Sequence, residues 1–242
     1  MNDTITIMDI DFVNTTQKEL LQNHIAPRLE AEKKSFIVTA NPEIVMQTRE
    51  DPRYKKSVQS ADYVTPDGVG VLMAAKYLKL PLKERIAGYD LMLDLLQYAN
   101  EHKLSCYFLG AKEEVNEKAV AEVKKQFPAI HIAGRHHGYF DIDDETITSE
   151  IERSKADLVF VALGLPRQEL WISRHIDKFS KGLFMGVGGS LDGLAGTFKR
   201  APDIWIKLNL EWLYRLLKQP TRFKRILKVF EFMFRIIFRK ST

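Results

Sequence analysis

A carboxylate stands at a strand-to-helix turn in the stretch ADYVTPDGVG, residues 61–70. Residues 61–65 are typical of a short strand, 66–68 of the turn that ends it, and 69–78 of an apolar helix. In α/β proteins ligands bind at the carboxyl ends of the strands, where a carboxylate such as Asp67 can take a proton from a hydroxyl. The stretch alone favours a simpler interpretation, a turn whose aspartate caps the helix.

Three more polar residues lie beside similar edges. The run SFIVT, residues 35–39, is typical of a buried strand and leads directly to Asn41, so Thr39 and Asn41 stand at a second strand-to-helix edge. Helix capping is the simpler role for Asn41. Arg85 precedes an amphipathic helix that Asp90 can cap, and its guanidinium is either a solvated charge or a phosphate ligand.

Strand exits in the second half of the chain carry glycine, at Gly110, at Gly164 and in the run Gly186-Val-Gly188-Gly189. Such exits let the backbone approach a phosphate, and the helix N-termini that follow supply amide hydrogens. This half therefore favours a nucleotide platform. Leu191 breaks the dinucleotide fingerprint at its third glycine and no Walker A sequence occurs, so a nicotinamide dehydrogenase and a P-loop ATPase rank low.

The elements that must position these residues alternate regularly from residue 104 onward. Strands are predicted over 105–110, 130–133, 157–163 and 182–187, and helices over 113–126, 144–154 and 167–179. This alternation predicts an α/β fold with a Rossmann-like parallel sheet, flanking helices and a C-terminal basic amphipathic helical appendage. We expect a catalytic core over 1–196, with the acceptor and base side in about 1–103 and the nucleotide side in about 104–196, followed by the appendage over 197–242.

Composition excludes several other classes of protein. With 242 residues, 45% of them hydrophobic and 28% charged, the chain is of the soluble globular type and is neither disordered nor collagen-like. Its single cysteine, Cys106, excludes an internal disulfide and is predicted to be buried. No stretch reaches the ~18 apolar residues of a membrane span, and the N-terminus lacks a signal-peptide pattern. We expect the protein on the cytoplasmic side.

Metal and nucleophile patterns are weak. Asp9-Ile-Asp11 and Asp141-Ile-Asp143 match the loose D-x-D pattern with which some sugar transferases hold a divalent metal, but loop solvation or helix capping is the better interpretation. The adjacent pair His136-His137 lacks the spacing of a zinc site. No Ser/His/Asp order or nucleophile elbow appears.

The C-terminal segment is basic and amphipathic. Between Arg215 and Lys240 nine basic residues accompany one acid, which gives this segment +8 and leaves −4 on the rest of a chain of net charge +4. Apolar residues repeat at helical spacing from Leu208 to Ile237, and Pro220 divides the run into two helices. An anionic membrane surface is favoured over nucleic acid or simple packing on the core, because Phe and Ile dominate the apolar side and the body is acidic.

Six motifs, in order along nearly the whole chain, resemble the WecG/TagA/CpsF glycosyltransferases, family 26. Six ordered motifs are far more specific than any one of them. The tail and the motifs look most like the TagA/TarA branch, which makes the linkage unit of wall teichoic acid. The motifs are TANPEIV (39–45), ADYVTPDGVGV (61–71), ERIAGYDLM (84–92), FLGAKEEV (108–115), VALGLPRQELW (161–171) and FMGVGGSLDGLAG (184–196).

The resemblance implies an inverting transfer of N-acetylmannosamine from its UDP donor to undecaprenyl-diphosphate N-acetylglucosamine. The product is a β-1,4 bond, and no metal or other cofactor is expected. The lipid-linked acceptor explains a soluble body with a basic tail, which makes the enzyme peripheral to the cytoplasmic face of the membrane. The implied partners are the UDP-sugar donor, the polyprenyl-diphosphate-linked GlcNAc acceptor and the anionic membrane surface, without nucleic acid.

The resemblance also implies roles for particular residues. Asp67 matches the family's proposed base, and Arg85 is the candidate that stabilises charge on the departing UDP. The family's pattern places further residues around the sugar and phosphates, namely Thr39, Asn41 and Gln168. It also places tail arginines near the active site, and Arg222 and Arg225 fit that idea. Strand exits alone suggest weaker nucleotide-site residues, namely Gly110, Gly164, Gly189 and Asp192.

Two alternatives stay open at this point. A related transferase with another donor, such as UDP-N-acetylmannosaminuronic acid or UDP-glucose, would keep the same scaffold. A non-enzymatic nucleotide-binding membrane adaptor would bind UDP or lipid, and its function would survive the loss of Asp67. The sequence leaves open the donor sugar, the oligomeric state, a homo-oligomer included, and whether the tail completes the active site or only anchors it.

Overall fold

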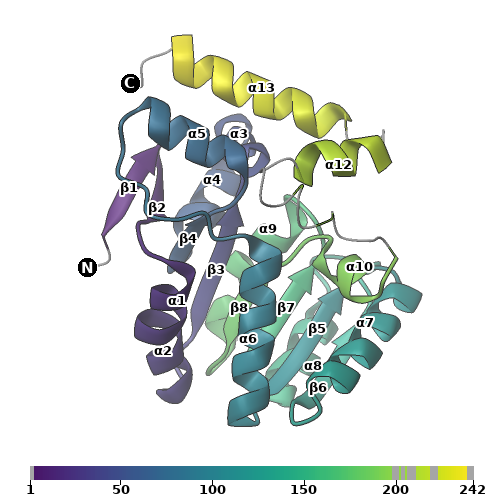
Figure 1. The fold of residues 1–242 in the computed structure, drawn as a ribbon. Helices are drawn as coiled ribbons and strands as arrows, with labels where there is room; N and C mark the ends of the chain where they lie inside the picture. The colour runs from purple at the N-terminus through teal and green to yellow at the C-terminus, as the bar shows by residue number, and fades with distance from the viewer. Residues whose placement is uncertain (1–2, 198–201, 203–204, 206–210, 219–222, 239–242) are drawn as a thin grey trace.

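The computed structural model describes residues 3–197, 202, 205, 211–218 and 223–238. Its centre is a six-stranded parallel sheet in the order β4-β3-β8-β7-β5-β6, with helices on both faces (Figure 1). The predicted Rossmann-like fold is confirmed. The strands are β3 (Ser35–Ala40), β4 (Tyr63–Pro66), β5 (Ser105–Gly110), β6 (His131–His136), β7 (Leu158–Ala162) and β8 (Leu183–Gly186).

Continuous apolar runs form the middle of the sheet. Every residue of β7 and of β8 is buried, as expected for parallel strands that are covered on both faces. The buried thiol of Cys106 on β5 agrees with the prediction for the single cysteine. The edge strand β6 is less buried, and it continues to His136, beyond the predicted end at residue 133.

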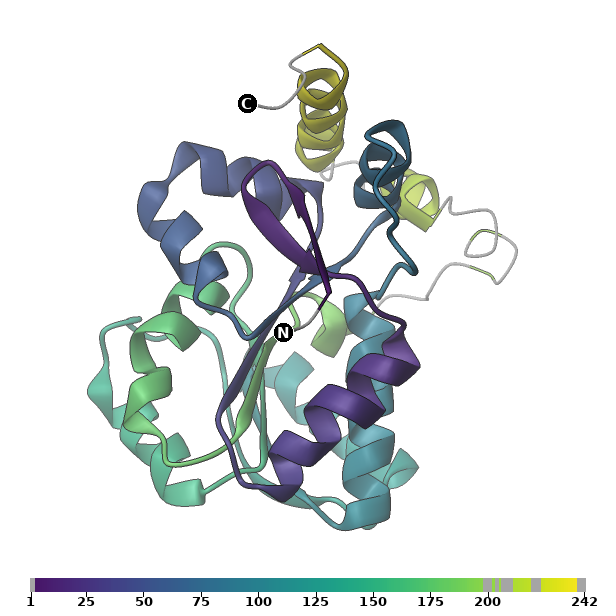
Figure 2. The same cartoon turned by 90° about the vertical axis from the view of Figure 1, so that its left-hand side faces the viewer.

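Two hydrophobic cores lie on opposite faces of the sheet, because successive strand residues point to opposite sides. Phe36 and Val159 belong to one core, whereas Ile37 and Leu158 belong to the other. The first face, here called the α9 face, carries α3 (Pro42–Glu50), α4 (Pro52–Gln59), α8 (Glu145–Ser154) and α9 (Arg167–His175). The second, the α6 face, carries α2 (Ala26–Glu30), α6 (Gly88–His102) and α7 (Glu113–Gln126). Figure 2 shows the two sets of helices on either side of the sheet.

The chain leaves the neighbouring strands β3 and β8 towards opposite faces. After β3, α3 packs on the α9 face. After β8, α10 (Ser190–Leu194) packs against α7 and buries Leu191 and Leu194 in the core of the α6 face. In open α/β sheets such a topological switch marks the place where ligands bind, outside the carboxyl ends of the strands. The sheet topology therefore points to the exits of β3 and β8.

An antiparallel hairpin, β1 (Thr4–Ile7) and β2 (Ile10–Val13), precedes the main sheet and packs beside β4. Met8 and Asp9, at its turn, both have positive φ, as the two-residue turns of hairpins require. The chain then enters a helical stretch of α1 (Gln17–Glu19), a π-helical segment (Leu20–Ile25) and α2. This arm lies close to the loop before α6.

In the part of the chain after the core that the structure describes, two helices lie on either side of position 220, as predicted. They are α12 (Glu211–Lys218) and α13 (Phe223–Phe238). α13 packs on α3 and on α5 (Val69–Tyr77), and its residues Phe232 and Ile236 are buried in the core of the α9 face. Within the described residues, no helix is long and apolar enough to cross a membrane. The division of the chain at residue 196 stays a prediction.

Two helix ends differ from the sequence expectation. Asp90 does not cap α6, because the helix begins at Gly88 with Ala87 in the capping position, and Asp90 lies in the first turn. α9 ends at His175 and gives way to a short 3-10 turn, Ile176–Lys178, where the sequence predicted helix up to residue 179.

Candidate active site

The exits of β3 and β4 bring two predicted site residues into adjacent positions. The strands pair in register, with Thr39 opposite Thr65 and Ala40 opposite Pro66, so Asn41 and Asp67 come next on either strand. The backbone N–H of Asp67 donates to the carbonyl oxygen of Ala40 at 3.0 Å. Asn41 caps α3 through its Oδ1, which accepts from the N–H of Ile44 at 3.0 Å. The capping role of Asn41 is therefore confirmed, and it fixes the side chain at this edge.

Asp67 lies at the N-terminus of α6. Its Oδ2 accepts a long hydrogen bond of 3.4 Å from the N–H of Gly88, the first residue of that helix. A side chain at Gly88 would bring a Cβ to 2.7 Å from the Oγ1 of Thr39, so only glycine lets the helix end approach so closely. A helix N-terminus favours a negative charge. Thr39, Asp67 and the start of α6 thus form one cluster around a half-buried carboxylate.

Arg85 lies between α5 and α6, in a stretch that contacts the β4 exit on one side of the arginine and the N-terminal arm on the other. Ile86, which is fully buried, donates its N–H to the carbonyl oxygen of Pro66 at 3.0 Å. On the other side, a carboxylate oxygen of Glu84 accepts from the backbone N–H of Gln17 at 2.9 Å. The half-buried Arg85 is therefore held near the exit of β4.

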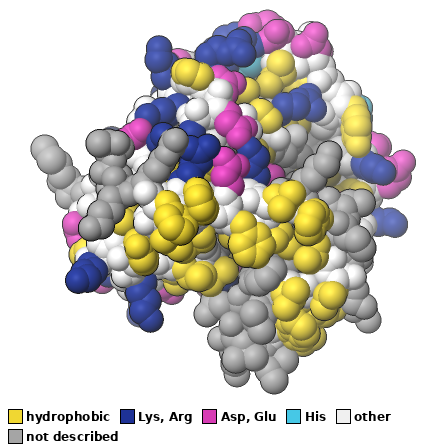
Figure 3. Space-filling model, turned by 90° about the horizontal axis from the view of Figure 1, so that it is seen from above, with side chains coloured by type: hydrophobic (Ala, Val, Ile, Leu, Met, Phe, Trp, Pro, Cys, Tyr) yellow, Lys and Arg dark blue, Asp and Glu magenta, His cyan; other side chains and the backbone are white. Residues whose placement is uncertain are grey.

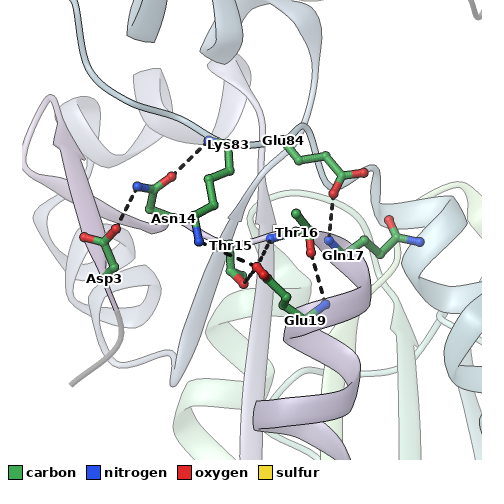
Figure 4. A network of polar contacts seen from close by, with 8 residues as sticks. All are labelled: Asp3, Asn14, Thr15, Thr16, Gln17, Glu19, Lys83 and Glu84. Carbon is green, nitrogen blue, oxygen red and sulfur yellow. Dashed lines mark hydrogen bonds and ion pairs between the residues drawn. The ribbon is translucent and has the colours of Figure 1, made fainter.

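The N-terminal arm supplies a polar network that the sequence analysis did not assign to the site (Figure 4). The buried Asn14 accepts from the backbone N–H of Lys83 at 2.9 Å and donates to the carboxylate of Asp3 at 2.9 Å. The Lys83 ammonium lies 3.6 Å from the carboxylate of Glu19. A hydrogen bond from the N–H of Thr16 holds the pKa of Glu19 below its usual range. The two residues form a capping box at the start of α1, and their T-x-x-E spacing in the sequence could have predicted it. A cleft of about 220 Å³ opens beside this network.

Gln168 joins the exits of β7 and β8. Its backbone N–H donates to the carbonyl oxygen of Gly164 at 3.0 Å, and its Oε1 accepts from the N–H of Gly188 at 3.0 Å. Its Nε2 donates to the buried carboxylate of Glu169 at 2.7 Å. Burial raises the pKa of Glu169 to about 7, against the opposing hydrogen bond from Gln168. The sequence analysis did not single out Glu169, although an acid on the apolar side of a predicted helix was a signal.

The other predicted nucleotide-site residues also lie at this edge of the sheet. Gly110 ends β5 with a φ of +118°, and a Cβ there would stand 2.4 Å from the carbonyl carbon of Ala162 on β7, so its position demands glycine. Gly164 follows β7, and Gly189 precedes α10. Asp192 lies within α10, where its carboxylate is near Gly189. The structure thus gathers these residues at the β5, β7 and β8 exits.

The tail arginines are not placed by the structure. Arg222 lies outside the described residues, and Arg225 belongs to the first turn of α13 with a side chain that also lies outside them.

The D-x-D aspartates take part in ordinary polar contacts. Asp9 pairs with Lys55 at 2.8 Å, and Asp143 forms an ion pair with Arg174.

The sheet order decides how these groups combine. β3 lies between β4 and β8, so the exit that carries Asn41 separates Asp67 on one side from the Gln168–Gly188 contact on the other. A carboxylate that can accept a proton is therefore separated by a single strand from the amides and glycine exits that are suited to a phosphate. Chemically, a base and a phosphate-binding edge on the same side of the sheet can serve a transfer from an activated donor to a hydroxyl.

Comparison with known proteins identifies the class. The model of the glycosyl transferase WecG/TagA/CpsF family matches residues 5–242. The chain belongs to this family and is a glycosyltransferase, as its six motifs predicted.

Two relatives are similar over nearly their whole length. An N-acetylglucosaminyldiphosphoundecaprenol N-acetyl-beta-D-mannosaminyltransferase of Bacillus spizizenii is 41% identical over 226 residues, which cover 93% of this chain and 88% of the relative. A protein of the same name from Staphylococcus aureus is 41% identical over 233 residues, which cover 96% of this chain and 91% of the relative.

Proposed function

We propose that this chain transfers N-acetylmannosamine from UDP-N-acetylmannosamine to the 4-hydroxyl of N-acetylglucosamine on undecaprenyl diphosphate. The product is a β-1,4 bond formed with inversion, in the synthesis of the wall teichoic acid linkage unit. The observation that carries the proposal is the carboxylate of Asp67 at the β4 exit, 3.4 Å from the first amide of α6. The names of the two relatives support the transferred N-acetylmannosamine and the lipid-linked N-acetylglucosamine acceptor, and the UDP donor and the β-1,4 linkage are part of our proposal.

In the proposed reaction Asp67 acts as the general base. An inverting transfer is a single displacement, in which the acceptor oxygen attacks the sugar carbon while the bond to UDP breaks. Asp67 takes the proton from the attacking hydroxyl. The N–H of Gly88 at the start of α6 holds the carboxylate at the β4 exit. Thr39 and Asn41 stand beside it, where they would orient the sugar.

The departing UDP gains negative charge on its β-phosphate, and this charge needs a donor group. Arg85 is our candidate, since a guanidinium can hold a phosphate with two parallel hydrogen bonds. The neighbours of Arg85 support this role, because Ile86 holds the backbone at the β4 exit and the side chain of Glu84 contacts Gln17. Gln168 and the glycine exits would bind the rest of the nucleotide. We infer that the charge is met by these groups without a divalent metal.

The acceptor is attached to a lipid, so the enzyme must work at a membrane surface. α13 exposes an apolar stripe that supports this step, formed by Phe223, Leu227, Phe230, Phe234, Ile237 and Phe238. Met73 and Tyr77 of α5 are about half exposed, and the hydroxyl of Tyr77 donates to the carbonyl oxygen of Ile237 at 3.5 Å, so α5 extends the stripe (Figure 3). Aromatic side chains of this kind insert into the interface of a bilayer.

The described basic residues of α13 carry less of the attachment than their number suggests. Lys228 forms an ion pair with Glu50 of α3, and Arg235 pairs with Glu231 at 2.9 Å. These pairs reduce the charge available to anionic lipid. We therefore assign the main attachment to the apolar stripe and propose that it docks on the cytoplasmic face of the membrane.

A donor screen tests the proposed substrate. Purified full-length protein is incubated in EDTA with a short-chain polyprenyl-diphosphate GlcNAc and, in separate reactions, radiolabelled UDP-N-acetylmannosamine, UDP-N-acetylmannosaminuronic acid or UDP-glucose. Transfer from the first donor alone supports the proposal. Preferential transfer from either of the others overturns the donor, and activity that appears only after a divalent metal is added overturns the metal-independent step.

A further inference from the structure

Glu169 is an acid in the interior of the protein. Its side chain is only 1% exposed, and it lies near the start of α9, directly after Gln168. Acidic residues are almost never fully buried without a partner, because a charge in the interior loses its hydration. Oε1 accepts from Gln168, and the hydroxyl of Tyr54 on α4 lies beside the carboxyl group, where its hydrogen bonding lowers the pKa of Glu169 against the effect of burial. A residue this costly to bury calls for a function.

The partner of Glu169 is the amide of Gln168, and the chemistry of the contacts fixes which way that amide points. The Nε2 of Gln168 can only donate, so the Glu169 oxygen that faces it at 2.7 Å accepts in either protonation state of the carboxyl group. The N–H of Gly188 can only donate, so Oε1 faces that group at 3.0 Å. Gly186 leaves room for this arrangement, since a Cβ there would stand 2.7 Å from Nε2. One chain of hydrogen bonds therefore runs from Glu169 through Gln168 to the β8 exit.

We propose that Glu169 is a positioning residue, which fixes the amide of Gln168 and through it the Gly188–Gly189 turn in the shape that receives the donor nucleotide. This inference rests on the proposed function, because it assumes that the β8 exit binds UDP. Glycines leave a turn free to adopt several conformations, and ordering it on binding would reduce affinity. The buried hydrogen bond between Gln168 and Glu169 holds the turn in place before the ligand arrives.

Two substitutions at one position separate this role from simple packing. Glu169→Met keeps the length of the side chain and removes the acceptor, whereas Glu169→Gln keeps a carbonyl oxygen that accepts from Gln168. Ile172→Val, on the same buried side of α9, is the matched control because it loosens the core without removing a polar group. Isothermal titration of the full-length protein with UDP gives the dissociation constant of each variant.

We expect Glu169→Met to raise the dissociation constant for UDP about tenfold, the equivalent of one well-placed buried hydrogen bond. Glu169→Gln should stay within about twofold of the wild type, and so should Ile172→Val. Equal weakening by the Met and Gln variants would mean that the acceptor oxygen does not matter. Wild-type affinity in Glu169→Met would overturn the proposal directly.

A second measurement does not depend on nucleotide or on sugar transfer. Hydrogen exchange of the peptide over residues 186–191, without ligand, should be faster in Glu169→Met than in the wild type, and unchanged in Ile172→Val. If Glu169→Met does not fold, Gln168→Met tests the same link from its other end. It should speed the same exchange, and adding Glu169→Gln to it should change nothing further. Unchanged exchange in these variants refutes the positioning role, whereas failure of every donor in the transfer assay refutes only the proposed function.

Discussion

Replacing Phe232 and Phe234 of α13 by alanine, one at a time, removes the same ring from different sides of one helix. Phe232 has no exposed surface and packs in the core of the α9 face, whereas Phe234 is 60% exposed. The two variants therefore separate the attachment of α13 to the body from its attachment to a membrane. Because both substitutions delete the same atoms and cost the same helix propensity, any difference between them comes from what each ring contacts.

The magnitudes follow from these exposures. Removing a buried phenylalanine costs about 3–5 kcal/mol through lost burial and the cavity left behind, so Phe232→Ala should release α13 from α3 and α5. Phe234 contributes little to folding stability, because most of its ring is already exposed to water in the folded protein. Full burial of a phenylalanine ring contributes about 1.5–3 kcal/mol. Moving the exposed part of the Phe234 ring from water into the bilayer should therefore contribute about 1–2 kcal/mol to membrane binding, so Phe234→Ala should weaken binding to vesicles about 5- to 30-fold.

Three assays read the two effects. Hydrogen exchange over residues 223–238 and thermal unfolding report the docking of the helix, and cosedimentation with phosphatidylglycerol vesicles reports membrane binding. Tyr139→Ala is the control for the vesicle assay, because Tyr139 is 69% exposed but follows β6, away from α13. Equal loss of thermal stability in Phe232→Ala and Phe234→Ala would refute the assigned faces, and unchanged vesicle binding in Phe234→Ala would refute the membrane stripe.

Three further predictions concern the carboxyl edge of the sheet. Gly110→Ala should destabilise the fold by more than about 1 kcal/mol and lower the melting temperature, because alanine is strained at this φ and its Cβ would overlap Ala162; an unchanged melting temperature would contradict this. Asn116→Ala should cost about 1–3 kcal/mol in urea unfolding, since the buried amide donates to the carbonyl oxygens of Phe108 and Gly110; no loss would mean that other groups satisfy them. Raising the pKa of Glu169 from 4.5 to about 7 corresponds to about 3 kcal/mol of stability. The wild type loses it as the pH rises from about 4.5 through 7, because the folded state holds this proton more tightly than the unfolded state. Urea unfolding at pH 5 and pH 8 should therefore show a smaller change in unfolding free energy for Glu169→Gln than for the wild type. An equal change in both proteins would contradict this assignment.

Local patterns in the sequence predicted much of the fold. β5 and α7 begin and end at the predicted residues 105–110 and 113–126, because a continuous apolar run and a charged amphipathic run each identify their element without help from the rest of the chain. The strand exits that carry Asn41 and Asp67 followed from the same reasoning, since parallel strands bring their carboxyl ends to one edge.

Contacts between distant residues could not be predicted in this way. Asp67 contacts Gly88, which follows it by 21 residues, at the start of α6. Asn14 accepts a hydrogen bond from Lys83, which lies 69 residues away in the chain. The buried Phe232 and Ile236 give α13 a second apolar face, which its helical periodicity did not reveal because packing on α3 and α5 decides it. No local pattern encodes such pairings.

The role of Asp67 as the base is the central claim, and one comparison of initial rates tests it most directly. Transfer of radiolabelled N-acetylmannosamine to the short-chain acceptor is measured in EDTA for the wild type, Asp67→Asn and Asp62→Asn. Asp62 is the matched control, because it lies at the opposite end of β4 and pairs with Arg28. We predict that Asp67→Asn lowers the rate by about 10²- to 10⁴-fold, the usual contribution of a general base, while Asp62→Asn stays close to the wild type. A folded Asp67→Asn variant with an undiminished rate would remove Asp67 from the mechanism.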